Sequence, residues 1–253
     1  MNKIALITGG VRRLGRYVTY YLANEGYDLA IIYNSSSKAE LDKTKAHLNT
    51  ILRLAPSSPQ VRSELKIKFY KCDIKDLKKL KNTVQKIGDD FKKIDVLVNN
   101  SGIIKQINFT DITQKLFDDT IDVNLRAMLF TSQFCLPYLL KSKEPQIINF
   151  ASLGGLLNWI KYIPYSISKA GVIKLTQLLA KTLAPKIRVN AIAPGTIIIE
   201  GEEKDTPGKA PIERIPLKKY GNTNDIINAV DYLIKAKYVT GQIIAVEGGR
   251  ILN

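Results

Sequence analysis

Short apolar runs that alternate with amphipathic segments most strongly limit how this chain can fold. The apolar runs occupy residues 3–7, 29–33, 67–72, 94–98, 146–151, 187–192 and 242–246. Apolar residues recur at helical spacing in the segments between them, at 14–26, 38–54, 76–91, 116–140, 164–184 and 223–235. Continuously apolar strands are buried on both faces, and strict alternation of strands with helices is typical of a parallel sheet. The sequence therefore predicts an α/β fold, with one doubly wound parallel sheet of about seven strands and helices on both faces.

The chain has no linker, repeat or low-complexity segment, so we expect one domain over residues 1–253. Its one long irregular stretch is 194–215, and long loops in compact domains usually have a function. This stretch passes from apolar Ile197-Ile198-Ile199 to a mostly charged tip at 200–205. The pattern is typical of a mobile lid over a pocket, and we predict a substrate lid at 194–215.

Composition excludes several classes of protein. The first apolar run is too short for a signal peptide or a membrane span, and Cys72 and Cys135 have no metal-ligand spacing. We therefore expect a cytoplasmic protein without a metal, a disulfide or a membrane partner. The net charge of +15 would attract phosphates, but the lysines are interspersed with acidic and apolar residues and form no block of five like charges. We interpret the charge as spread over solvated helix faces, and the single histidine, His47, as a surface residue.

A glycine-containing turn follows the first predicted strand and reads Thr8-Gly9-Gly10-Val11-Arg12-Arg13-Leu14-Gly15. Glycines let the backbone approach a ligand, and the N-terminus of the following helix offers free N–H groups to a pyrophosphate. Ligands bind at the carboxyl ends of the strands in such sheets. The turn therefore predicts a dinucleotide site whose residues include Gly9, Arg12, Arg13, Leu14 and Gly15.

The end of the second predicted strand favours NADP over NAD. An enzyme that prefers NAD places an acidic residue there, on the ribose 2′-hydroxyl. In this chain the first acidic residue after that strand is Glu40, and the positions before it are Tyr33, Asn34, Ser35 and Ser36. Hydroxyl and amide groups can bind a 2′-phosphate, and Arg12 or Arg13 can neutralise it. We therefore expect NADPH as the cofactor.

Tyr165 and Lys169 are the strongest candidates for catalysis. They are four residues apart on a predicted helix, so their side chains lie on one face. The pKa of tyrosine is ordinarily about 10, and a neighbouring ammonium group lowers it. The pair could then exchange a proton with a substrate near neutral pH. Because ordinary amphipathic helices also contain such pairs, the assignment depends on the residues around it.

Three further residues accompany this pair. Ser152 follows the fifth predicted strand, thirteen residues before Tyr165, and can hydrogen-bond a substrate carbonyl. Asn124 lies inside the predicted helix at 116–140, where asparagine is disfavoured, and this indicates a specific role. Trp159 either forms a wall of the substrate pocket or packs in the core.

Motifs along essentially the whole chain resemble those of the short-chain dehydrogenase/reductase family, which has a Rossmann fold. In order, they are Thr8-Gly9…Gly15, Cys72-Asp73-Ile74, Asn99-Asn100-Ser101-Gly102, Asn124, Ser152, Tyr165 with Lys169, Pro194-Gly195, and Val239-Thr240-Gly241…Glu247-Gly248-Gly249. Each motif alone is modest, but the ordered set is specific.

The resemblance implies a role for each matching residue. Tyr165 would be the general acid, Lys169 would hold the nicotinamide ribose and tune Tyr165, Ser152 would orient the substrate, and Asn124 would support a water relay to Lys169. Asp73 would contact the adenine. Other cofactor contacts would come from Ile74, Asn100, Ser101, Gly102, Pro194, Gly195, Thr196 and Ile197. The family resemblance also implies a homo-oligomer, a dimer or a tetramer, built on the two long helices.

Two residues favour different substrates. Arg13 stands where the family usually has a glycine. The run Arg12-Arg13-Leu14-Gly15-Arg16 resembles the pteridine reductase branch, in which an arginine at this place reaches the cofactor phosphates and the pterin. That branch has an aspartate at the place of Ser152, whereas ketone reductases, including 3-oxoacyl-carrier-protein reductases, have a serine. The substrate is therefore a pterin-like C=N bond or a ketone such as a 3-oxoacyl thioester. Its site would include Arg13, Ser152, Trp159 and Tyr165. Acyl carrier protein is acidic, so lysine patches near the pocket would suit it as a partner.

Two other functions fit parts of the sequence. A non-catalytic NADP(H)-binding regulator could share the fold, but a broken Tyr/Lys pair would mark it, and here the pair is intact. A nucleic-acid-binding protein would concentrate Lys and Arg on one face with aromatic residues between them, and the sequence does not show this clearly. We therefore expect an NADPH-dependent reductase of a small molecule, without a nucleic-acid partner.

Overall fold

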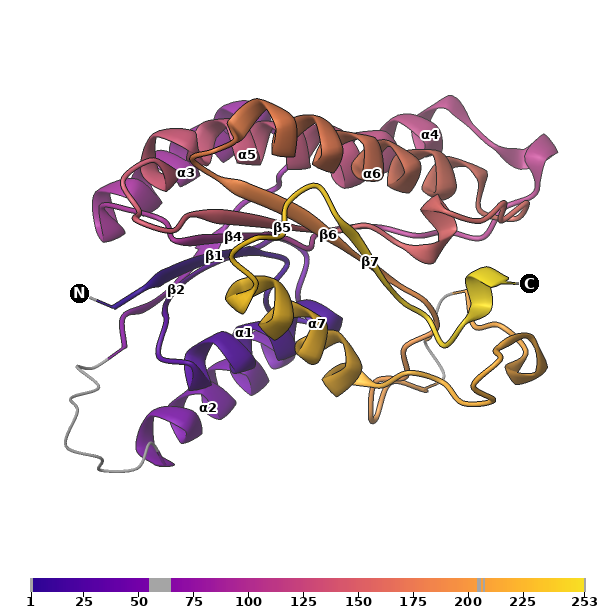
Figure 1. The fold of residues 1–253 in the computed structure, drawn as a ribbon, viewed down its shortest axis with the longest axis horizontal. Coiled ribbons are helices and arrows are strands. Elements are labelled where there is room, and N and C mark those ends of the chain that lie inside the picture. Colours follow the sequence, from indigo (N-terminus) through magenta and orange to yellow (C-terminus); the bar gives the residue numbers. More distant parts are fainter. Residues whose placement is uncertain (1, 55–64, 204–205, 207, 253) are drawn as a thin grey trace.

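The computed structural model describes residues 2–54, 65–203, 206 and 208–252, and its centre is one sheet of seven parallel strands (Figure 1). The strands lie in the order β3-β2-β1-β4-β5-β6-β7, and every neighbouring pair is parallel. Their bounds are β1 (Ile4–Thr8), β2 (Asp28–Tyr33), β3 (Ile67–Lys71), β4 (Val96–Asn99), β5 (Gln146–Phe150), β6 (Arg188–Pro194) and β7 (Ile243–Val246). This confirms the predicted doubly wound α/β fold.

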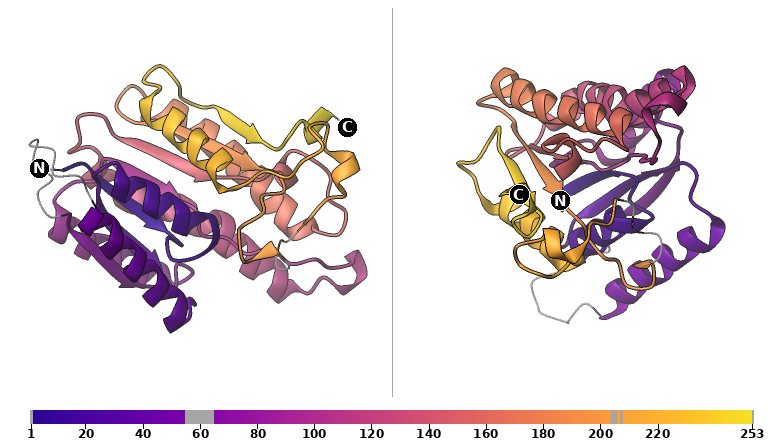
Figure 2. Two further views of the ribbon diagram at one scale, coloured as in Figure 1. Left: turned by 90° about the horizontal axis from the view of Figure 1, so that it is seen from below. Right: turned by 90° about the vertical axis from the view of Figure 1, so that its right-hand side faces the viewer.

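Helices cover both faces of the sheet (Figures 1 and 2). One face carries α1 (Arg13–Asn24), α2 (Lys38–Leu54) and α7 (Thr223–Lys235); the other carries α3 (Leu77–Phe91), α4 (Gln114–Ile121), α5 (Ala127–Leu139) and α6 (Ile163–Leu183). Successive residues of a strand point to opposite faces. In β1, Ala5 and Ile7 accordingly pack into the core that includes α1 and α7, while Ile4 and Leu6 pack into the core that includes α3 and α5. Burial on both faces explains why β1 is apolar at each position from Ile4 to Ile7.

The strand order reverses between β1 and β4, which lie side by side although β2 and β3 come between them in the chain. Hydrogen bonds tie the two strand ends together. Thr8 Oγ1 accepts from the backbone N–H groups of Asn100 (3.1 Å) and Ser101 (3.2 Å), and Asn100 Nδ2 donates to the carbonyl oxygen of Gly9 (3.1 Å). A crevice at such a reversal, outside the carboxyl ends of the strands, is where ligands bind in open α/β sheets.

The structure corrects the prediction of one continuous α-helix at 116–140. A turn of π-helix, η2 (Asp122–Arg126), separates α4 from α5. Its central residue, Asn124, is fully buried and bonds outside its own helix: Oδ1 accepts from the N–H of Ile103 (2.8 Å), while Nδ2 donates to the carbonyl of Ile103 (2.9 Å) and to Ser168 Oγ (3.0 Å). Single π turns inside α-helices are frequent at functional sites. Helical periodicity alone does not reveal such a turn.

The stretch after β6 is held to the rest of the fold at several points. Ile197 pairs with Gly221 in an isolated bridge, and η5 (Ile212–Arg214) follows as a short 3-10 helix. Lys204 and Asp205 of the expected charged tip lie outside the described residues. Among the described helices, none is long and apolar enough to cross a membrane.

Candidate active site

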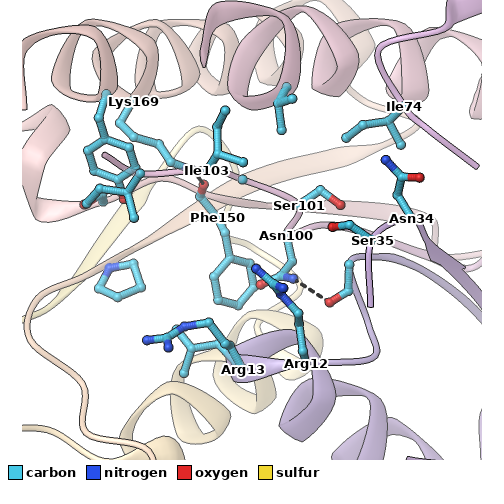
Figure 3. Close-up of a pocket in the computed structure, with 18 of the residues that line it drawn as sticks. Arg12, Arg13, Asn34, Ser35, Ile74, Asn100, Ser101, Ile103, Phe150 and Lys169 are labelled. Carbon is cyan, nitrogen blue, oxygen red and sulfur yellow. Dashed lines mark hydrogen bonds between the residues drawn. The ribbon is translucent and has the colours of Figure 1, made fainter. Parts of the chain in front are cut away.

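A cavity of about 480 Å³ opens at the carboxyl ends of the strands, where the predicted site residues meet (Figure 3). Loops that follow β1, β2, β3, β4, β5 and β6 all contribute to its wall. The predicted residues that line it are Gly9, Arg12, Arg13, Leu14, Tyr33, Asn34, Ser35, Ser36, Asp73, Ile74, Asn100, Ser101, Gly102, Ser152, Trp159, Tyr165, Lys169, Pro194, Gly195 and Ile197. The structure thus brings the predicted glycine turn and the predicted catalytic residues to one cavity.

Three predicted residues support the wall rather than line it. A Cβ atom on Gly15 would lie 2.2 Å from the carbonyl oxygen of Gly9, so only glycine lets α1 pack this closely against the turn. Thr196 Oγ1 accepts a hydrogen bond from the backbone N–H of Ala210 (3.3 Å). Asn124 fixes the loop at Ile103 against α6, as described above.

Sequence reasoning missed several residues of the wall. Ile103, Ile104 and Phe150 adjoin predicted motifs, so extending those motifs by one or two positions would have found them. Lys75 and Asp119 also line the cavity and form an ion pair with a Nζ–Oδ1 distance of 2.9 Å. Asp119 comes from α4, and no local sequence signal indicates that it faces the cavity.

Tyr165, Lys169 and Ser152 lie together at one end of the cavity. Lys169 is buried, its Nζ donates a hydrogen bond to the carbonyl oxygen of Phe150 (2.6 Å), and it lies 5.8 Å from the centre of the Tyr165 ring. Ser152 precedes the short 3-10 helix η3 (Leu153–Gly155), and its Oγ accepts from the N–H of Gly154 (3.0 Å). The carbonyl of Phe150 and the N–H of Gly154 thus hold the lysine and the serine beside the phenol of Tyr165.

Burial controls the protonation of this pair. Burial raises the pKa of Tyr165 above its ordinary value, and a hydrogen bond with Ser152 opposes part of that rise. Burial also lowers the pKa of Lys169 to about 8. We expected the lysine to lower the tyrosine pKa. The pKa is raised instead, because removal from water outweighs the opposing hydrogen bond with Ser152. The tyrosine therefore keeps its proton, which is the form a general acid needs.

The glycine turn carries two arginines that point in different directions. Figure 3 shows Arg12 on the side of Asn34 and Ser35, whereas Arg13 extends away from them. Arg13 has a φ of 50°, in the left-handed region where glycine is usual. Its Nη1 lies 3.5 Å from Oε2 of Glu202 in the 194–215 stretch. Arg12 is therefore the better placed of the two for a 2′-phosphate.

Glu202 also binds a second arginine of this region. Arg16 Nη1 lies 3.5 Å from Oε1 of Glu202. The Arg16 side chain is buried, and its Nε donates to the carbonyl oxygen of Val11 (2.9 Å). One carboxylate thus connects the predicted lid to the predicted phosphate site.

Trp159 forms part of the cavity wall and stacks on Tyr165, with ring centres 6.4 Å apart and 18° between the planes. It also packs closely on Gly154, where a Cβ atom would lie 2.8 Å from the indole ring.

Both cysteines, Cys72 and Cys135, are buried and free. Among the described residues, no group of three or more His, Cys, Asp or Glu side chains is arranged to hold a metal ion.

Comparisons with known proteins agree with this geometry. Residues 3–208 match the family model described as short chain dehydrogenase. The chain is 36% identical over 254 residues to the 3-oxoacyl-[acyl-carrier-protein] reductase FabG of Staphylococcus epidermidis. The aligned region covers 98% of this chain and 99% of that protein.

Two solved structures share the fold over the whole of this chain. One is a 3-oxoacyl-[acyl-carrier protein] reductase from Brucella melitensis in complex with NAD, at 29% identity and a TM-score of 0.84, with 98% of that chain covered. The other is ElxO with NADP bound, at 27% identity and a TM-score of 0.83, with 100% of that chain covered.

The close approach of η3 to α6 gives a test of the site's geometry. A Cβ atom on Gly155 would lie 2.6 Å from the carbonyl carbon of Lys169, although the backbone of Gly155 is not in the left-handed region. We expect Gly155→Ala to push Ser152 away from Tyr165 and to lower kcat for the expected NADPH-dependent reaction by roughly 100-fold, because misplacement by about 1 Å has effects of that size. Steady-state kinetics would measure the loss.

Asn158→Ala is the matched control, because Asn158 is exposed in the same loop and already carries a Cβ atom. We expect this variant to keep the wild-type kcat. A thermal melt would show that Gly155→Ala is folded, and a folded Gly155→Ala enzyme with unchanged kcat would contradict the prediction.

Proposed function

Because the chain belongs to the short chain dehydrogenase family of oxidoreductases, we propose that it is an NADPH-dependent reductase of 3-oxoacyl thioesters presented on acyl carrier protein. The observation that carries this proposal is the position of Ser152, Tyr165 and Lys169 at one end of a single cavity whose other end is the glycine turn. The 36% identity to a 3-oxoacyl-[acyl-carrier-protein] reductase supports the substrate class.

The residues present fit a nicotinamide dinucleotide, which supplies the hydride when bound. Gly15 lets the N-terminus of α1 pack closely against the glycine turn. The free backbone N–H groups of that N-terminus could bind a pyrophosphate. The two solved relatives carry NAD and NADP respectively, so the choice depends on local residues. Arg12, Asn34 and Ser35 line the same cavity, and the carboxylate of Glu40 accepts from the N–H of Ser37 (2.8 Å) at the start of α2. A cation with polar neighbours, and no acidic residue at the strand end, favours NADPH.

In the proposed reaction the protein positions the carbonyl and supplies a proton. The Ser152 hydroxyl would hydrogen-bond the carbonyl oxygen, and the Tyr165 hydroxyl would donate its proton to that oxygen as the hydride reaches the carbon. Lys169 would stabilise the phenolate that remains. A Cβ atom on Gly102 would lie 3.3 Å from Asn124 Oδ1 and 3.6 Å from Lys169 Nζ, so glycine leaves space between these groups. That space supports the proposed water relay from Asn124 to Lys169.

A ketone is favoured over a pterin as the substrate. A pterin would use Arg13, whose guanidinium instead contacts Glu202, and Ser152 stands where the pterin-reducing branch resembled by the sequence has an aspartate. Exposed apolar residues on α5 and α6, including Leu129, Ile167 and Leu178, support a homo-oligomer through these helices. A cytoplasmic location completes the proposal, as predicted from the sequence.

The substrate class can be tested by NADPH oxidation. We expect turnover with acetoacetyl-CoA and little or none with dihydrobiopterin. Tyr165→Phe should lower kcat by about 10³-fold, because general acid catalysis contributes 10²–10⁴-fold, and should leave the Kd for NADPH unchanged. Turnover of dihydrobiopterin alone would move the proposal to the pterin branch, and full activity of Tyr165→Phe would remove its assigned role.

The cofactor preference can be tested with two neighbouring arginines. We expect the wild type to have a lower KM for NADPH than for NADH. Arg12→Ala should lose roughly 10-fold of that preference, because a charge-assisted hydrogen bond contributes about 1.5–3 kcal/mol. Arg13→Ala is the control and should keep most of the preference, since this side chain extends toward Glu202. A loss in Arg13→Ala alone would contradict the assignment.

The lowered pKa of Lys169 predicts how reduction depends on pH. Burial disfavours the ammonium form, so the lysine loses its proton as the pH rises through about 8. Loss of that positive charge makes the phenolate less stable and slows proton donation. We expect kcat for reduction to be constant below this value and to fall above it. Lys169→Arg, which stays charged, should lose this step in its remaining activity, and a wild-type profile unchanged on either side of this pH would contradict the prediction.

A further inference from the structure

The last described helix places a cation beside the proposed substrate site. The 3-10 helix η6 (Arg250–Leu252) holds Arg250 over the face of Trp159, with Cζ 5.0 Å from the ring centre. Trp159 lines the cavity and stacks on Tyr165. The guanidinium is therefore one aromatic ring away from the proposed proton donor. Arginine stacked on an aromatic ring is held in orientation by a cation–π interaction.

Arg250 has hydrogen-bonding capacity that the described part of the chain does not use. Its Nη1 is buried and has no hydrogen-bond partner there. A buried donor without a partner costs about 1–3 kcal/mol, and more when it is charged. Most buried polar groups are satisfied, so this one calls for an explanation such as a ligand or an ion.

A second arginine, Arg214, lies close enough to Arg250 for its charge to be felt. Burial and the nearby positive charge of Arg214 both lower the pKa of Arg250. Glu247 is the acidic residue whose charge opposes them, but its Oε2 accepts a hydrogen bond from the N–H of Ile251 (2.9 Å). No carboxylate of the described residues forms an ion pair with Arg250. A guanidinium group that forms no ion pair attracts an oxyanion.

We propose that Arg250 binds an oxyanion of the substrate, at the end away from the reacting carbonyl, and so determines which substrates are selected. The proposal rests on the proposed reductase function, which places the carbonyl at Tyr165. A thioester substrate offers two sources of such a group, the phosphate of a pantetheine arm and a carboxylate on the acyl chain. Trp159 holds the guanidinium ready before the substrate arrives, which lowers the cost of binding.

A fluorescence titration tests this site without turnover. Trp159 is the only tryptophan of the chain, so tryptophan fluorescence reports directly on the ring under Arg250. Enzyme saturated with NADP⁺ would be titrated with 4′-phosphopantetheine, with pantetheine, which lacks the phosphate, and with succinate. We expect a saturable change with 4′-phosphopantetheine if the phosphate is the source, or with succinate if a carboxylate is. Pantetheine should give none.

Variants connect the signal to Arg250. Arg250→Gln should lose the response, Arg250→Lys should keep part of it, and Lys237→Gln, which removes a surface cation paired with Glu144 (2.5 Å), should keep all of it. The proposal is overturned if neither oxyanion changes the fluorescence, if pantetheine acts like 4′-phosphopantetheine, or if Arg250→Gln responds like the wild type.

Kinetic measurements distinguish an Arg250 that binds an oxyanion from an Arg250 that only supports the Trp159 ring. If the phosphate is the source, Arg250→Gln should raise the KM for acetoacetyl-CoA by roughly 10-fold, the size expected for one charge-assisted hydrogen bond. It should leave kcat unchanged and spare the acetoacetyl N-acetylcysteamine thioester, which has no phosphate. Equal losses with both thioesters would show that Arg250 only supports Trp159. If the wild type reduces neither thioester, the proposed function fails, while the titration still decides whether Arg250 binds an oxyanion.

Discussion

The hydrogen bonds between Thr8 and the segment that begins at Asn100 are the constraint on which the rest of the site depends. They hold the ends of β1 and β4 together where the strand order reverses, and this reversal opens the crevice above the sheet. The glycine turn starts on one side of this junction, and the loop that reaches Asn124 starts on the other. The proposed cofactor end and the proposed catalytic end of the cavity are thus fixed to each other through two strands.

Buried polar side chains behind the cavity continue this framework. Asn99 Nδ2 donates to Asn149 Oδ1 (2.9 Å), and Asn149 Nδ2 donates to Thr176 Oγ1 (3.0 Å), so β4, β5 and α6 are linked in a row. Buried amides are costly unless they are paired, and pairing makes one arrangement of these elements preferred over others. Since α6 carries the tyrosine and the lysine, this row sets where the proposed proton donor, Tyr165, stands relative to the sheet.

Local sequence patterns were sufficient for the sheet and for most of the cavity wall, because both depend on short motifs at strand ends. Features that depend on contacts between distant segments were not predictable. The π turn at Asn124 follows from bonds to Ile103 and Ser168, and the raised pKa of Tyr165 follows from burial, which a four-residue spacing does not reveal. Arg250 directly follows the motif that ends at Gly249, but nothing in that motif indicates a contact with Trp159, and only the fold brings the two together.

The position of Glu202 between Arg13 and Arg16 determines how the 194–215 stretch responds to the ionic strength of the solution. The Arg16 guanidinium is buried, but the Arg13 contact joins two partly exposed groups 3.5 Å apart, so it resembles a surface ion pair, which contributes about 0–1 kcal/mol. An anchor of that strength competes with thermal motion, and dissolved salt weakens it further. Ionic strength therefore acts on the entrance of this cavity as well as on any charged molecule that approaches it.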